Sequence, residues 1–282
     1  MIKITADSVC DLTPAILEEL DITLVPLYIH AGDQVFRDGV DITPEEVFRF
    51  AETHGKLCRT GALNSEEYKD FFAPLASRYE SVIHINIGQH FSICHQNACV
   101  AAREFTNVYV LDSQNLSSGS GHLVYDAALM ARDGVGAQEI CRRIQEEAPL
   151  VDASFVIDRL DYLYKGGRCS GLEAIGARLL SIKPCIEVAD GKMRVGKKYR
   201  GSFELCLERY VEDRLRLREG DSIDKSRLFI THPACSPETV ARVREVVAKL
   251  ATFEEIIETR AGCTISSHCG PKTLGVLFKR LP

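Results

Sequence analysis

Short β-rich runs alternate with helix-forming segments along the first half of the chain, and this alternation restricts the fold more than any other feature of the sequence. Thr13-Pro14 and Thr43-Pro44 each place a capping residue before a proline at the first helical position, and a further helix begins at Asn64 or Ser65. The β-rich runs between the helices predict strands at residues 2–6, 24–29, 81–87 and 107–111. Strands that alternate with helices are typical of an α/β fold with a mainly parallel sheet.

The pattern changes after Pro149. Strands are predicted at residues 154–157, 185–189, 193–199, 228–231 and 255–259, and helices at about 203–217 and 237–250. Asp190-Gly191 predicts a hairpin turn between two of these strands. We therefore expect a two-domain fold: residues 1–150 form an N-terminal three-layer α/β/α domain, and residues 151–282 form a C-terminal α/β domain with a mixed sheet.

Composition narrows the class of protein. The chain has 282 residues, of which 45% are hydrophobic and 26% charged, and this balance is ordinary for a globular protein. A net charge of -6 argues against a nucleic-acid partner. We find neither a signal-peptide pattern nor an apolar run long enough to span a membrane, so we expect a cytoplasmic protein without an integral membrane segment. The eleven cysteines are odd in number and lack a C-x-x-C pair, so we interpret them as small buried hydrophobic residues.

Two glycine-rich segments resemble phosphate-binding loops but lack essential residues. Gly171-x4-Gly176 is followed by Ala177-Arg178, where a P-loop needs lysine and a hydroxyl residue. Gly119-Ser120-Gly121 has Val124 at the third glycine position of a dinucleotide-binding turn. The sequence therefore predicts no nucleotide cofactor.

Other residues carry weaker signals of a site. His90, Cys94, His95 and Cys99 match no zinc-ligand spacing, so we predict no metal site and interpret the segment as the entry to a helix. Lys165-Gly166-Gly167-Arg168 predicts a sharp turn that directs a guanidinium, a natural receptor for carboxylate or phosphate.

Three further residues combine a structural and a functional interpretation. The segment 263–267 has the composition of a strand, which would place His268 where that strand gives way to a tight turn. Thr60 and Ser92 each precede a predicted helix, where hydroxyl residues usually act as caps. No nucleophile-elbow sequence surrounds either residue.

In their order and spacing, several segments together resemble the DegV family over essentially the whole chain. They are Asp7-Ser8-Val9-Cys10-Asp11-Leu12, Thr43-Pro44-Glu45-Glu46-Val47-Phe48, Arg59-Thr60, Phe91-Ser92 with Gln96-Asn97-Ala98, Asp112-Ser113 with Ser118-Gly119-Ser120-Gly121, Leu160-Asp161-Tyr162-Leu163 with Lys165-Gly166-Gly167-Arg168, Lys183-Pro184, Asp190-Gly191, and His268-x-Gly270-Pro271 with Leu274-Gly275.

The resemblance implies a monomeric, non-catalytic carrier that buries one long-chain fatty acid in a tunnel between two domains. It implies that Thr60, Ser92 and His268 hold the carboxylate, with Arg168 as a possible contact of the head group or of a phosphate. It also implies that the carrier presents the carboxylate to a separate fatty acid kinase, which forms the acyl phosphate, so that the carrier needs no cofactor and no metal.

The chain departs from the family pattern near the head-group residues. Gly61-Ala62-Leu63-Asn64, Gly88-Gln89 and Ile93-Cys94-His95 replace more polar family segments, and Lys272 replaces a glycine. Gln89, His90 and His95 are candidates for substitute donors. These departures leave three alternatives open: a carrier of another lipid or small carboxylic acid, a hydrolase or transferase with Ser92 as nucleophile and His268 as base, and a ligand-free regulatory protein.

Overall fold

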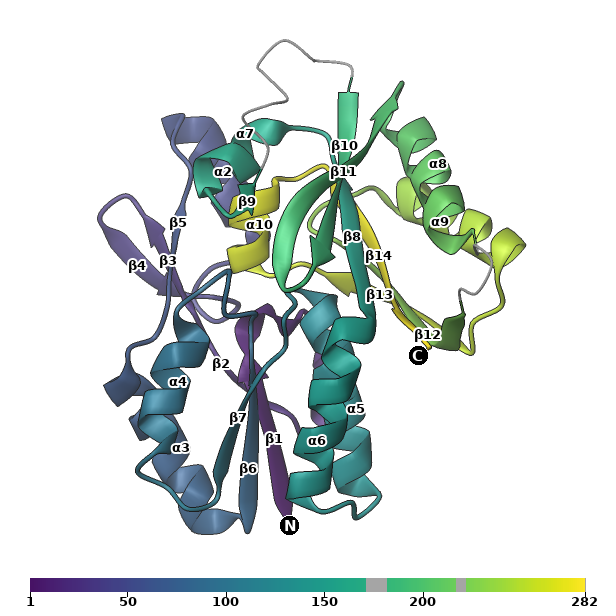
Figure 1. Ribbon diagram of the computed structural model, residues 1–282. Helices are drawn as coiled ribbons and strands as arrows, with labels where there is room; N and C mark the ends of the chain where they lie inside the picture. The colour runs from purple at the N-terminus through teal and green to yellow at the C-terminus, as the bar shows by residue number, and fades with distance from the viewer. Residues whose placement is uncertain (171–181, 217–221, 282) are drawn as a thin grey trace.

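The computed structural model describes residues 1–170, 182–216 and 222–281. A four-stranded parallel sheet forms the centre of the N-terminal half, with its strands in the order β2 (Thr23–Val25), β1 (Ile2–Asp7), β6 (Ser81–Asn86) and β7 (Val108–Asp112). The helices α3 (Ser65–Arg78) and α4 (Cys94–Ala102) cover one face, and α5 (Ser118–Arg132) and α6 (Ala137–Glu147) cover the other (Figure 1). The predicted three-layer arrangement is confirmed.

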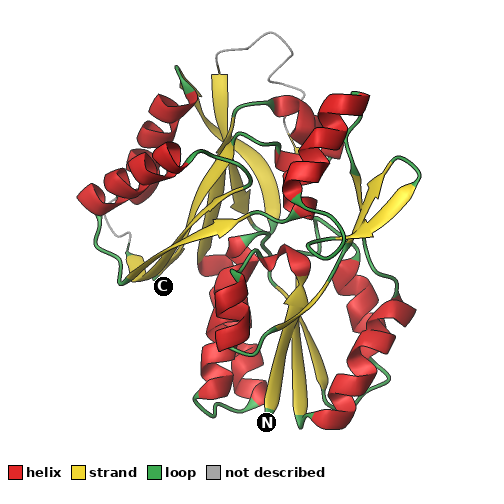
Figure 2. Ribbon diagram, turned by 180° about the vertical axis from the view of Figure 1, so that it is seen from behind, coloured by secondary structure: helices red, strands yellow, loops and turns green. Residues whose placement is uncertain are grey.

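The second sheet is mixed and has seven strands in the part of the chain that the structure describes. Their order is β13 (Glu255–Arg260), β12 (Ile223–His232), β14 (Thr273–Arg280), β8 (Val151–Ile157), β10 (Ile182–Ala189), β11 (Lys192–Arg200) and β9 (Cys169–Ser170). The helices α8 (Phe203–Leu215) and α9 (Pro237–Leu250) pack together on one side of it (Figure 2). The predicted hairpin is confirmed: Asp190 and Gly191 have φ angles of 51° and 70°, as a two-residue turn of this type requires.

A small antiparallel sheet and three helices lie beside and between these two halves. The sheet has the order β4 (Gln34–Arg37), β3 (Tyr28–Ala31), β5 (Arg59–Gly61). The helix α10 (Cys263–Cys269) packs against α2 (Pro44–His54), α7 (Leu160–Gly166) and this small sheet (Figure 1). The short elements are η1 (Ser8–Cys10), α1 (Pro14–Glu19) and η2 (Ala148–Leu150).

The helix starts follow the predicted capping chemistry. Thr43 and Asn64 each accept a hydrogen bond from the backbone N–H three residues later, and Glu46 and Glu67 bond back to complete two capping boxes. Thr13 likewise accepts from the backbone N–H of Ile16. Local sequence therefore determines where these three helices begin.

The single strand predicted at residues 24–29 is wrong. β2 ends at Val25 in the parallel sheet, and β3 begins at Tyr28 in the small antiparallel sheet. Pro26 lies between them, and proline has no backbone N–H for a sheet ladder. The chain therefore leaves one sheet and enters another within two residues.

The strand predicted at residues 263–267 is also wrong, because this segment forms α10. The Ser266 and Ser267 hydroxyls donate to the carbonyls of Ala261 and Cys263, so these polar side chains are satisfied inside the helix. His268 consequently lies in the last turn of a helix, not at the end of a strand. Tertiary contacts here override a weak helix propensity.

The boundary between residues 1–150 and 151–282 stays a prediction. The first strand of the seven-stranded sheet begins at Val151, whereas α10 from the C-terminal half packs against α2 from the N-terminal half. The segment from Gly171 to Arg178 and the predicted helix end at Leu217 lie outside the described residues. No helix within the described ranges is both long and apolar enough to cross a membrane.

Candidate ligand-binding site

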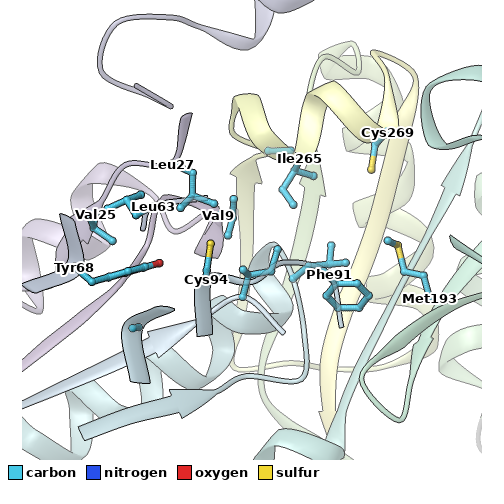
Figure 3. Close-up of a cluster of buried hydrophobic side chains, with 14 of the residues drawn as sticks. Val9, Val25, Leu27, Leu63, Tyr68, Phe91, Cys94, Met193, Ile265 and Cys269 are labelled. Atoms are coloured by element: carbon cyan, nitrogen blue, oxygen red, sulfur yellow. The ribbon is translucent and has the colours of Figure 1, made fainter. Parts of the chain in front are cut away.

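A cavity of about 430 Å³ lies where the two halves meet. Its apolar wall comes from both halves of the chain, and Figure 3 shows five of these residues within one hydrophobic cluster: Leu27, Phe91, Met193, Ile265 and Cys269. A smaller cavity of about 30 Å³ adjoins it, because the two share Leu116, Ile265 and Cys269. Side chains that line the larger cavity thus also line a small apolar space against the seven-stranded sheet.

The polar groups of the larger cavity include all four residues predicted from the sequence: Thr60, Ser92, Arg168 and His268. Thr60 lies in β5 and not before a helix, so the prediction that it acts as a helix cap is wrong. Its Oγ1 lies 3.0 Å from His268 Nε2 on α10. A hydroxyl and an imidazole from opposite halves of the chain thus meet at the cavity wall.

His268 is held in its neutral form. Burial, together with the nearby positive charge of Arg168, lowers the pKa of the imidazole to about 4. Its Nδ1 is buried and has no hydrogen-bond partner among the residues that the structure describes. A neutral imidazole donates from one nitrogen only, so the direction of the Thr60 hydrogen bond depends on which nitrogen carries the proton.

Ser92 forms hydrogen bonds with a buried polar network. Its hydroxyl accepts from the backbone N–H of Cys94 at 3.3 Å and also lies 2.9 Å from the Cys94 thiol. The prediction that Ser92 caps the helix is wrong, because the N-cap of α4 is Ile93 and no side chain caps this helix. Cys94 is fully buried and hydrogen-bonds to Tyr68, whose hydroxyl donates to Asp7. Ser92 is thus paired with Cys94, and His268 with Thr60. This pairing is not the serine-to-histidine hydrogen bond that the hydrolase alternative requires.

Arg168 lines both the cavity and a second groove outside it. Its Nη1 donates to the Gly166 carbonyl at 2.6 Å, at the end of α7, where the predicted turn is confirmed by Gly167 at a φ of 65°. Outside the wall formed by Thr60, His268 and Arg168 lies a second groove of about 660 Å³.

That outer groove is cationic. It is lined by Lys56, Arg59, Lys165 and Arg168, and none of these four forms an ion pair with a carboxylate among the described residues. Asp33 is the one acidic residue that lines it there. On a chain of net charge -6, this makes the groove a locally positive surface beside the polar end of the cavity.

Only two of the three candidate substitute donors line the cavity. Gln89 and His90 line the cavity, whereas His95 contacts the Cys99 thiol at 3.5 Å. Across the described ranges, no group of three or more His, Cys, Asp or Glu side chains is placed to hold a metal ion.

Thr264 is a cavity residue that sequence reasoning missed. It is buried and lines the cavity, and within the described ranges its hydroxyl oxygen has no hydrogen-bond partner. It stands four residues before His268 on α10, so both lie on the same face of the helix. The i, i+4 spacing is visible in the sequence, but it has meaning only if the segment is recognised as a helix.

Taken together, the fold and the site define a two-part α/β protein with an internal apolar cavity that ends in hydroxyl and imidazole groups. The chain belongs to the DegV family: the family pattern, described as an uncharacterised protein of the DegV family, matches residues 1–280.

Relatives and solved structures agree with this assignment over almost the full chain. A DegV domain-containing protein of Caldanaerobacter subterraneus subsp. tengcongensis is 32% identical over 284 residues, covering 99% of this chain and 98% of the relative. A protein of Thermotoga maritima named a fatty acid-binding protein is 28% identical over 289 residues, covering 97% and 96%. The structure of a DegV family protein from Thermus thermophilus, described as fatty acid binding, has a TM-score of 0.90 at 25% identity and covers 99% of each chain.

Proposed function

We propose that this chain binds one long-chain fatty acid, with its tail in the apolar cavity and its carboxylate at Thr60, Ser92 and His268. The observation that carries the proposal is the Thr60 and His268 pair, 3.0 Å apart, at the polar end of an otherwise largely apolar space. The fatty acid-binding relatives of Thermotoga maritima and Thermus thermophilus support the same ligand class.

The binding free energy of a fatty acid has an apolar and a polar part, as the cavity has an apolar wall and a polar end. An acyl tail gains about 0.8 kcal/mol per buried methylene, so a 16-carbon chain gains on the order of 10 kcal/mol before association costs. A buried carboxylate without partners would offset much of this gain. Hydrogen bonds from the hydroxyls and the charge of Arg168 remove that cost.

The tautomer of the neutral His268 decides the direction of the proposed hydrogen bonds. If Nε2 carries the proton, it donates to Thr60 Oγ1, and the threonine hydroxyl is free to donate to a carboxylate oxygen. Ser92, which also lines the cavity, supplies a second donor. The carboxylate thus receives two hydroxyl donors, with a guanidinium close by.

We further propose that the carrier is a cytoplasmic monomer that presents the carboxylate to a separate fatty acid kinase. The cationic outer groove supports this step, since it adjoins Thr60, Arg168 and His268 and would attract the negative charge of a transferring phosphoryl group. In this proposal Arg168 neutralises the developing acyl phosphate, and the carrier contributes no catalytic residue, cofactor or metal of its own.

The test is mass spectrometry of an organic extract from the purified and denatured protein, scaled to protein concentration. Near-equimolar fatty acid is the expected result and would identify the preferred chain. A well-folded protein that yields no fatty acid and binds none on addition would refute the proposal. Labelling of Ser92 by a serine-directed covalent probe, lost in Ser92→Ala, would instead support the hydrolase alternative.

A further inference from the structure

The helix α10 forms a wall of the cavity, although it has only seven residues. Thr264, Ile265, His268 and Cys269 all reach the cavity from it. A helix of this length is unstable by itself, because few of its backbone groups can bond to one another. Groups outside α10 must therefore fix its position.

Two buried carboxylates from the N-terminal half bind the start of α10. Asp38 accepts hydrogen bonds from the backbone N–H groups of Cys263 at 2.8 Å and Thr264 at 3.1 Å. Asp11 accepts from the backbone N–H of Gly262 at 2.9 Å. Three successive amides at the start of the helix are thus held by side chains more than 200 positions away in the sequence.

This arrangement is costly for stability. Asp11 and Asp38 are 5% and 3% exposed, and neither carboxylate forms an ion pair with a Lys, Arg or His within the described ranges. Asp11 and Asp38 face each other and uncharged buried thiols, and burial raises the pKa of Asp11 to about 7. Only hydrogen bonds and the positive end of α10 offset the negative charge. Such a pair indicates a role in exact placement of the helix.

The other end of α10 carries His268, whose Nε2 lies 3.0 Å from Thr60 Oγ1 at the cavity wall. A helix of seven residues is one rigid unit, so a shift at Cys263 is transmitted to His268, about 7 to 8 Å further along the axis. We propose that Asp38, assisted by Asp11, is a positioning residue for the head-group site: it fixes the first turn of α10 so that the imidazole of His268 reaches Thr60. This inference rests on the proposed binding of a fatty acid carboxylate.

Asparagine can preserve the hydrogen bonds of Asp11 but not all those of Asp38. Both oxygens of Asp38 accept, since Oδ2 receives the Thr264 N–H and the Ser8 hydroxyl while Oδ1 receives the Cys263 N–H. An asparagine offers one acceptor oxygen and loses at least one of these bonds. At Asp11 the second partner is the Ser117 hydroxyl, which can reverse and accept from an amide. Asp38→Asn should therefore disturb α10, and Asp11→Asn should not.

The test compares two ligands, palmitic acid and its methyl ester, which share a tail and differ in the charged head group. The wild type should prefer the acid. Asp38→Asn should bind the acid ten- to a hundred-fold more weakly and should lose clearly less affinity for the ester. A displaced α10 changes the tail contacts of Ile265 and Cys269 with both ligands, but the hydrogen bonds to a charged carboxylate are lost only with the acid. Asp11→Asn should keep the wild-type preference.

The matched control is Asp41→Asn, an exposed carboxylate three residues after Asp38 that pairs with Arg37 and not with α10. It should leave the preference unchanged. If Asp38→Asn does not fold, Ser8→Ala removes one donor to Asp38 and should lower the preference in the same direction. A second readout is the NMR titration of His268 in the free protein: in Asp38→Asn its pKa should rise from about 4 toward the ordinary value.

The outcomes separate cleanly. An Asp38→Asn protein that keeps both its acid preference and the low pKa of His268 overturns the inference. Equal weakening of acid and ester also overturns it, because Asp38 would then only support the fold. If the wild type binds neither ligand, the proposed function fails, and the His268 titration of the free proteins decides the inference alone.

Discussion

Thr60 and His268 are separated by 208 positions in the sequence, yet their side chains form a hydrogen bond. The hydrogen bond restricts the rotamers of both side chains at the cavity wall. Preorganisation of this kind reduces the side-chain entropy lost on binding. It also means that each partner depends on the other for its orientation.

Replacement of Thr60 by valine tests the contribution of the threonine hydroxyl to this pair. Thr60→Val keeps the shape but removes the hydroxyl, so a carboxylate loses one donor and His268 loses its Nε2 partner. Since a hydrogen bond to a charged group is worth about 1.5 to 3 kcal/mol, we expect fatty acid affinity to fall at least tenfold in isothermal titration calorimetry. Thr239→Val, near the start of α9 and far from the cavity lining, should bind as the wild type does.

The protonation of His268 provides a second prediction at this scale. In the free protein burial and Arg168 lower its pKa to about 4, and a bound carboxylate nearby favours the imidazolium, so binding should raise that pKa. The complex then binds more protons than the free protein between the two pKa values of His268, and affinity should increase as the pH falls through the raised pKa toward 4. NMR titration of the imidazole with and without fatty acid measures both pKa values. An unchanged pKa near 4 in the complex would place the carboxylate elsewhere.

At the scale of elements, the end of α7 presses against His268. A Cβ atom added at Gly166 would lie 2.3 Å from His268 Nδ1, far inside contact distance. Gly166→Ala should therefore displace the imidazole from Thr60 and weaken fatty acid binding roughly tenfold or more, as loss of the same hydrogen bond does. The control is Gly136→Ala before α6, where an added Cβ meets nothing within 4 Å. Calorimetry on both variants would contradict this account if they bound equally well.

The elements that the sequence predicted are those with local signals. Caps at Thr13, Thr43 and Asn64 and the Asp190-Gly191 turn depend on neighbours within a few residues, and all were correct. The helix α10 was interpreted as a strand because its stability comes from Asp11 and Asp38, which no local window contains.

The candidate site likewise combines features that the sequence predicted with features that depend on tertiary contacts. Thr60, Ser92, Arg168 and His268 were selected by resemblance to a family, and the structure brings all four to one cavity. Their secondary structure could not be predicted equally well, since Thr60 lies in a strand and His268 in a helix. Thr264 was missed because its place on the cavity face follows from the helical period of α10.

At the scale of the whole molecule, α5 joins the two halves. His122 is fully buried on this helix, packs edge-on against Phe229 in β12 with ring centres 4.6 Å apart, and lies 3.1 Å from the Leu277 carbonyl in β14. Its other ring nitrogen has no hydrogen-bond partner in the described part of the chain. A protonated imidazole at this point would be a buried charge between the parallel sheet and the seven-stranded sheet.

The stability of the molecule should therefore fall in mild acid, in part because of His122. Burial lowers its pKa to about 4, although the carboxylate of Asp126 nearby acts in the opposite direction, and Arg227 and Lys279 lower it further. A lowered pKa means that the unfolded chain binds more protons, so this contribution is complete above pH 6.5 and is lost as the pH falls toward 4. The shift corresponds to roughly 3 kcal/mol over that range.

His122→Gln isolates this contribution, because the glutamine amide can still donate to the Leu277 carbonyl but does not titrate. Urea unfolding at pH 7 and pH 5 should show a smaller loss of unfolding free energy in the variant than in the wild type. Asp11 shifts stability in the reverse direction: its raised pKa of about 7 favours the folded state at low pH and is present in both proteins, so it cancels in the comparison. Equal losses of unfolding free energy in the two proteins would show that His122 does not couple the packing of the two sheets to pH.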